Sequence, residues 1–109
     1  LSPASVSTQR DVSVGLDNVG TVLLAARKLG EARRFFEASL GIREKLATQD
    51  PASAAAQRDL IVSLDKLGDV LQEEGAAGEA RRRYQASLVI AEKLAAANPG
   101  SAEAQRDVA

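Results

Sequence analysis

Apolar residues recur at steps of three and four along most of the chain, and alternation of apolar with polar residues is missing. In the C-terminal half, one apolar stripe consists of Leu60, Leu64, Leu67 and Leu71. After a short polar stretch, a second stripe consists of Ala80, Tyr84, Leu88, Ala91 and Ala95. Steps of three and four place side chains on one face of an α-helix. The pattern therefore predicts an all-α protein without strands.

Proline, serine and glycine mark the ends of these helices. Ser5, Ser53 and Ser101 each follow a proline by two positions, and serine is a preferred N-cap. Gly75 stands where a helix would end in a left-handed turn. Arg27 occupies the matching place in the first half, so either that turn is strained or the helix ends at a later residue, Gly30. The predicted helices are Ser5–Arg27, Gly30–Gln49, Ser53–Glu74 and Gly78–Ala97, with a stub from Ser101.

The triplet Gln-Arg-Asp occurs at positions 9–11, 57–59 and 105–107, at a constant step of 48 residues. Without gaps, 26 of the 48 residues of 9–56 are identical in 57–104. Such a recurrence indicates a tandem repeat. We expect one domain over 1–109, with a leader (1–8), two repeats (9–56 and 57–104) and the start of a third (105–109). No methionine stands at position 1 and the last repeat is incomplete, so we expect a piece of a longer array.

Composition excludes several classes of site. The chain has no cysteine and no histidine, so it lacks thiolate ligands, the commonest metal ligand and the usual general base. We therefore expect no enzyme activity, no cofactor and no metal site. The net charge is −1, which gives no bulk attraction to nucleic acid or membrane. No apolar run spans a bilayer and no signal-peptide pattern is present, and we expect a cytoplasmic location.

The spacing of small and aromatic residues resembles the tetratricopeptide repeat (TPR). In the first repeat the matching residues are Leu16, Val19, Gly20, Leu23, Ala32, Phe36 and Ser39. In the second they are Leu64, Leu67, Gly68, Leu71, Ala80, Tyr84 and Ser87. The resemblance implies a right-handed α-solenoid of antiparallel helix pairs, with helices crossing at the two glycines. The family period is about 34 residues, and each helix here is longer by about two turns, as in long-repeat members of signalling and cargo-adaptor proteins.

In this family the first helices of successive pairs line a groove that binds partners. The groove positions implied here are Val14, Asp17, Asn18, Thr21, Leu24 and Ala25, then Val62, Asp65, Lys66, Asp69, Gln72 and Glu73. Most of these positions differ between the repeats, which favours partner contact over a solvated face that is free to drift. Asp17 and Asp65 stand where carboxylate-binding members need lysine. The acidic second half of the groove instead suggests a basic or mixed-charge protein segment.

The recurring triplet favours a structural role over ligand contact. We expect a ladder of ion pairs between repeats, with Arg58 reaching Asp11 and Arg106 reaching Asp59; Arg10 and Asp107 complete the set. The arginines at 81–83, echoed at 33–34, are not interleaved with exposed aromatic residues. They are therefore interpreted as a solvated face and not as a nucleic-acid site.

Two functions follow from these observations. The first is a protein-interaction scaffold that binds a peptide or helix of a partner protein in the groove. The alternative is a structural module that stacks end to end with other copies, because the apolar face of helix Gly78–Ala97 lacks a complete neighbouring repeat.

Overall fold

The computed structural model describes residues 5–97, and all of its regular structure is helical. The helices are α1 (Val6–Ala25), α2 (Leu29–Gln49), α3 (Ala54–Glu73) and α4 (Ala77–Ala97). This confirms the prediction of an all-α protein, with helix ends within two residues of those expected. The predicted stub from Ser101 lies outside the described residues.

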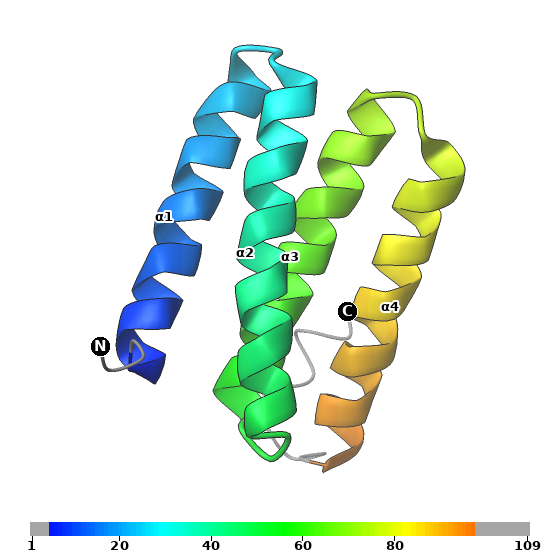
Figure 1. The fold of residues 1–109 in the computed structure, drawn as a ribbon. Coiled ribbons are helices and arrows are strands. Elements are labelled where there is room, and N and C mark those ends of the chain that lie inside the picture. The colour runs from blue at the N-terminus through cyan, green and yellow to red at the C-terminus, as the bar shows by residue number, and fades with distance from the viewer. Residues whose placement is uncertain (1–4, 98–109) are drawn as a thin grey trace.

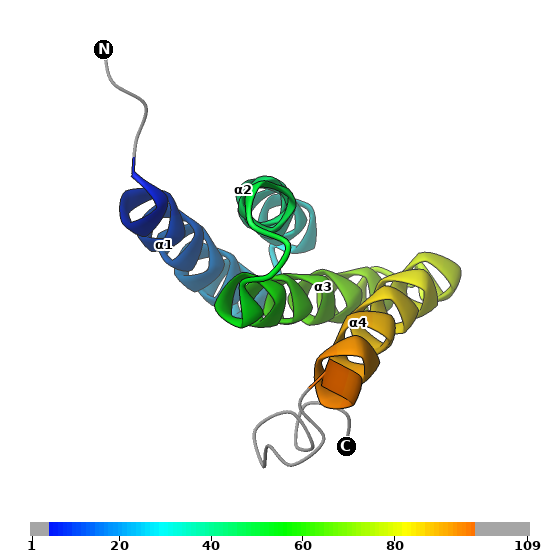
Figure 2. The same ribbon diagram turned by 90° about the horizontal axis from the view of Figure 1, so that it is seen from below.

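Each helix packs against the next one along the chain (Figure 1). Seen from below, α2 lies in the angle between α1 and α3, and α4 lies on the other side of α3 (Figure 2). The side chains of α2 therefore contact helices of both repeats, and this central position makes α2 the main link between them.

The serine caps predicted for α1 and α3 are present in the structure. The hydroxyl of Ser5 accepts a hydrogen bond from the backbone N–H of Thr8 at 3.1 Å, and that of Ser53 accepts one from Ala56 at 3.1 Å. Each serine satisfies one of the N–H groups that have no partner inside the helix. Local sequence therefore sets where α1 and α3 begin.

Both helix pairs turn through the same hydrogen-bonded motif, although the residues at the turn differ. In the first turn Lys28 N–H donates to the carbonyl of Leu23 and Arg27 N–H to that of Leu24, both at 2.9 Å. Arg27 has a φ of 62° and Gly75, at the matching place, has a φ of 84°. Of the two sequence interpretations, the strained turn is the one observed, since Arg27 adopts a left-handed conformation that costs about 1–2 kcal/mol for a side chain with Cβ.

The glycines of the two repeats lie under aromatic rings of the following helix. A Cβ built on Gly20 would lie 2.6 Å from the Phe36 ring, and one on Gly68 would lie 2.6 Å from the Tyr84 ring. Both distances are shorter than any ordinary carbon contact, so only glycine fits. Each glycine therefore makes room for an aromatic ring of the following helix.

The core runs along the contact between α2 and α3. Its buried residues are Ala32, Phe36, Leu40, Leu64, Leu67, Val70, Leu71 and Ala80. Phe36 is 1% exposed, and the ammonium of Lys66 lies 5.9 Å from the centroid of its ring. The second repeat thus covers the aromatic residue of the first.

Two kinds of feature are missing from the described part of the chain. Over residues 5–97, no helix is long and apolar enough to cross a membrane. In the same range, acidic side chains do not gather in a group of three that could hold a metal ion.

Candidate functional site

Four of the predicted groove residues meet around one hollow between the C-terminal halves of α1 and α3. The hollow has a volume of about 350 Å³ and is lined by Leu24, Arg27, Asp69, Gln72 and Glu73. Leu24 packs against the core, so it offers an apolar floor, and the other lining residues are polar. The arrangement suits a side chain with an apolar stem and a charged end.

Asp69 and Gln72 are held in place by Tyr84 of α4. The Tyr84 hydroxyl lies 2.5 Å from Oδ1 of Asp69, to which it donates, and 3.2 Å from Oε1 of Gln72. Burial and the hydrogen bond to Asp69 raise the pKa of Tyr84 to about 12. The phenol therefore stays protonated at neutral pH and fixes one acidic side chain at the rim of the hollow.

Glu73 is tied to the first repeat by Arg27. The guanidinium Nη1 lies 2.7 Å from Oε2 of Glu73, and the two side chains are 63% and 51% exposed. An ion pair this exposed is worth about 0–1 kcal/mol. An incoming cation can therefore replace Arg27 at Glu73 with little loss. Beside it, Arg33 of α2 holds Glu74 through Nε at 2.9 Å.

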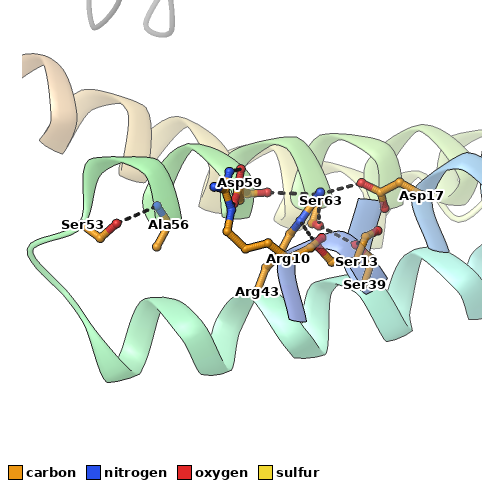
Figure 3. A network of polar contacts seen from close by, with 9 residues as sticks. All are labelled: Arg10, Ser13, Asp17, Ser39, Arg43, Ser53, Ala56, Asp59 and Ser63. Carbon is orange, nitrogen blue, oxygen red and sulfur yellow. Dashed lines mark hydrogen bonds and ion pairs between the residues drawn. The ribbon is translucent and has the colours of Figure 1, made fainter. Parts of the chain in front are cut away.

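Asp17 is not in the groove, and this corrects the sequence interpretation. Its side chain is buried and pairs with Arg43 of α2, whose Nη1 lies 2.6 Å from Oδ2 of Asp17 (Figure 3). The exposed fractions of the two side chains are 6% and 5%. Since neither charge reaches solvent, Asp17 is a structural residue.

Arg43 also reaches the second repeat, so the pair is the centre of a cluster of polar groups. Its Nη1 donates to the Ser63 hydroxyl at 2.8 Å and its Nε to the Ser13 hydroxyl at 3.1 Å. The Ser39 hydroxyl donates to the carbonyl of Ser13 at 3.1 Å. Three helices, α1, α2 and α3, therefore meet at one guanidinium (Figure 3).

Over its described residues the second repeat lacks this cluster, since Ala91 stands in place of Arg43 and Ile61 in place of Ser13. Residues 48 positions apart occupy matching places, so Asp65 corresponds to Asp17 and Ala91 to Arg43. Ala91 is buried, whereas Asp65 is exposed. Ala91 offers no cation to Asp65, so the two equivalent aspartates lie in different environments within the described residues.

The ladder between repeats has the opposite direction from the one expected. Arg10 of the first repeat pairs with Asp59 of the second, through Nε to Oδ2 at 2.7 Å and Nη2 to Oδ1 at 3.2 Å. The two expected pairs, Arg58 with Asp11 and Arg106 with Asp59, took the arginine from the later repeat. The hydrogen bond to Asp59 and its charge raise the pKa of Arg10 further above its ordinary value.

Part of the predicted ladder cannot be compared with the structure. Arg106 and Asp107 lie outside the described residues, and Asp11 is exposed. The observed pair joins α1 to α3 near the starts of these helices, and the pair of Arg27 with Glu73 joins them near their ends. The groove surface is therefore bounded at both ends by ion pairs.

The remaining predicted groove residues line the surface without forming a pocket together. Asn18, Thr21, Ala25 and Asp65 are exposed, and Lys66 is half-buried because it covers Phe36. Thr21 donates its hydroxyl to the carbonyl of Asp17 within its own helix at 2.8 Å. The exposed valines Val14 and Val62 add an apolar element to this surface.

Three residues that organise these side chains were missed by the sequence reasoning. Arg27 was treated only as a turn residue and Tyr84 only as a core residue, but both control groove carboxylates. Arg43 was not singled out. A signal for Arg43 was present, since it interrupts the apolar stripe at the place where the second repeat has Ala91.

Comparison with known proteins adds no relative. No protein-family model, no curated protein and no solved structure gives a significant match to this chain.

Proposed function

We propose that the chain is a helical-repeat protein of TPR type, a right-handed solenoid in which α1 and α3 line the concave side. Its function in this proposal is to bind a segment of a partner protein along the surface of these two helices. The observation that carries the proposal is the hollow lined by Leu24, Asp69, Gln72 and Glu73 together with Arg27.

The chemistry of the hollow indicates the class of partner. It presents two carboxylates, one guanidinium and the side of one leucine. Asp69 is pre-positioned by Tyr84, and Glu73 can exchange its exposed pair with Arg27 for a cation of the partner. The partner segment therefore carries lysine or arginine next to an apolar side chain.

The position of the hollow favours an extended or helical segment over a small molecule. Val14 and Val62, which are 48% and 43% exposed, lie on the same two helices toward their N-terminal halves. A segment placed along the groove would contact these valines with apolar side chains and reach the hollow with its basic end. The proposal assigns only binding to these residues and contains no reaction.

Selection of random peptides displayed on phage against the immobilised full chain tests this proposal. We expect the selected peptides to be enriched in lysine or arginine beside apolar residues. Asp69→Lys with Glu73→Lys should lower their association rate in a salt-dependent way. Leu24→Asp should mainly raise the dissociation rate. Both rates are measured by surface plasmon resonance.

A matched control separates the groove from general charge. Glu44→Lys with Glu92→Lys makes the same change in net charge on exposed positions of α2 and α4, and it should leave both rates unchanged. Peptides without enrichment in basic residues, or equal binding by the groove and control variants, would rule out the proposed site.

A further inference from the structure

The outward face of α1 corresponds to the face of α3 that packs against α2. Residues 48 positions apart match, so Val19 corresponds to Leu67 and Val22 to Val70. Leu67 and Val70 are 1% and 0% exposed and share the core cluster with Phe36. Val19 and Val22 are 44% and 68% exposed. Among the described residues, α1 therefore presents an apolar face on which no helix packs.

The outward face of α4 corresponds in the same way to the face of α2 that packs against α3. Leu40 on α2 is 5% exposed, whereas its counterpart Leu88 is 47% exposed. A shallow depression of about 360 Å³ follows this face of α4. Its lining residues are Gln72, Ala77, Ala80, Arg81, Tyr84, Gln85 and Leu88.

We propose that α1 of one copy of this chain packs on α4 of a second copy in the way that α3 packs on α2 within one copy. The contact between α2 and α3 inside one chain is the model for this contact. The α1 face matches the face of α3 in that contact, and the α4 face matches the face of α2. The interaction does not require the partner proposed above, although the depression on α4 shares Gln72 with the hollow of the groove.

The substitutions between repeats fit this second contact. Where Arg43 meets Ser63 inside the chain, at 2.8 Å, the counterpart residues are Ala91 and Gly15. Both are small and neither carries a side-chain polar group, so the contact between copies buries no charge at this point. Val12, Val19 and Val22 would then cover Tyr84 and Leu88.

Such a contact has two different halves, so it does not close within a dimer. Over residues 5–97 each copy exposes one α1 face and one α4 face, so further copies can add at both ends. In this proposal the α4 face of one copy binds the α1 face of another copy. The competing arrangement is a symmetric contact between the α4 faces of two copies. The two arrangements respond differently to substitutions on one face.

Sedimentation velocity of the full chain over a wide range of concentrations tests the proposal. We expect the average mass to rise above the 11.4 kDa of one copy. Val19→Glu blocks the α1 face and Leu88→Glu blocks the α4 face, and each variant alone should remain a monomer. An equimolar mixture of the two should give a complex of one copy of each, because one α4 face and one α1 face stay intact.

Matched controls lie on the same helices but off the two faces. Val14 is 48% exposed, and its counterpart Val62 is still 43% exposed although α3 has neighbours on both sides. Val89, on α4, is 50% exposed, and its counterpart Gly41 is also exposed. Val14→Glu and Val89→Glu should associate like the unaltered chain. Circular dichroism of all four variants should show unchanged helix content.

Three results would overturn the proposal. The first is a chain that stays monomeric at every concentration. The second is association lost in Leu88→Glu but kept in Val19→Glu, which would indicate a contact between two α4 faces. The third is a mixture of the two face variants that contains only monomers.

Discussion

The two repeats use one pattern of residues to build two different centres. In the first repeat Asp17 is buried against Arg43, whereas in the second Asp65 is exposed and Ala91 is buried. The aromatic residue also differs, since Phe36 is enclosed by the second repeat and Tyr84 uses its hydroxyl to hold Asp69. Two repeats with matching helices therefore accommodate either a polar or an apolar centre, provided that a buried carboxylate is paired with a guanidinium.

The comparison teaches that a repeated residue does not have a repeated role. The buried aspartate has an arginine partner on the neighbouring helix, 26 positions further along the chain, whereas alanine stands at that place in the second repeat.

The largest effect is expected for Arg43→Ala, which gives the first repeat the residue of the second. It leaves the Asp17 carboxylate buried without its cation, and Oδ1 of Asp17 already lacks a hydrogen-bond partner among the described residues. Removing one partner of a buried ion pair costs about 3–5 kcal/mol. Urea unfolding followed by circular dichroism measures this loss.

Two further variants sharpen this result. Asp17→Ala combined with Arg43→Ala should cost less than Arg43→Ala alone, because the unpaired charge is removed as well. Lys45→Ala removes an exposed cation of the same helix and should change stability by no more than about 0.5 kcal/mol. Equal losses for Arg43→Ala and Lys45→Ala would contradict a buried ion pair.

The second prediction compares the two glycines under aromatic rings. Gly20→Ala and Gly68→Ala both place Cβ 2.6 Å from a ring carbon, and overpacking of this kind costs about 1–3 kcal/mol. Phe36 is enclosed, whereas Tyr84 has open space on its outer side. Gly20→Ala should therefore lower the melting temperature more than Gly68→Ala, and the reverse order would show that the outer side of Tyr84 is not free to yield.

The third prediction concerns the two turns. Arg27→Gly removes a strain of about 1–2 kcal/mol and loses an exposed ion pair worth about 0–1 kcal/mol, so we expect a gain in stability of about 0.5–1 kcal/mol. The control Arg27→Ala loses the ion pair but keeps Cβ in the left-handed conformation, and it should not stabilise the chain. Thermal melting distinguishes the two, and a gain in both variants would mean that φ is not the cause.

The fourth and smallest effect is on titration. Tyr84 is the single tyrosine of the chain and tryptophan is absent, so the near-ultraviolet absorbance of phenolate reports this residue alone. Its pKa should be about 12. Because the pKa is raised by folding, the stability that Tyr84 contributes is complete below its ordinary pKa of 10.0 and is lost as the pH rises toward about 12.

Substitution of the acceptor tests the cause of this raised pKa. Asp69→Asn removes the charge that accepts the hydrogen bond and should lower the pKa of Tyr84 toward its ordinary value. Asp65→Asn removes a weaker influence and should lower it less. An unchanged value in both variants would leave burial as the sole cause.

Local features of the fold could be predicted from the sequence because they depend on residues close together in the chain. Ser5 and Ser53 cap helices, and Gly75 ends one, through contacts within a few residues. Gly20 and Gly68 could be placed at close approaches because both repeats show the same small residue at the same step. The serines and these glycines recur at a step of 48 residues, and this recurrence made them recognisable in the sequence.

The burial of Asp17 and the direction of the ladder could not be predicted in the same way. Asp17 and Asp65 are the same residue at the same position, so only the difference between Arg43 and Ala91 on the following helices could separate them. The pair of Arg10 with Asp59 depends on how far α3 is displaced along α1. That displacement follows from packing on α2 and not from any local pattern.

The guanidinium of Arg43 has a consequence for how two near-identical repeats avoid exchanging partners while they fold. A chain with such similar halves is open to misassembly, in which a helix docks on the wrong copy of its neighbour. If α2 docks where Asp17 and Ser63 are not both present, Arg43 enters the interior without its acceptors, which is costly. The helix that matches α2 in the second repeat has Ala91 and cannot satisfy Asp17 in its place. Arg43 thus distinguishes α2 from the otherwise similar α4. Only the native order of helices pairs its buried charge with Asp17.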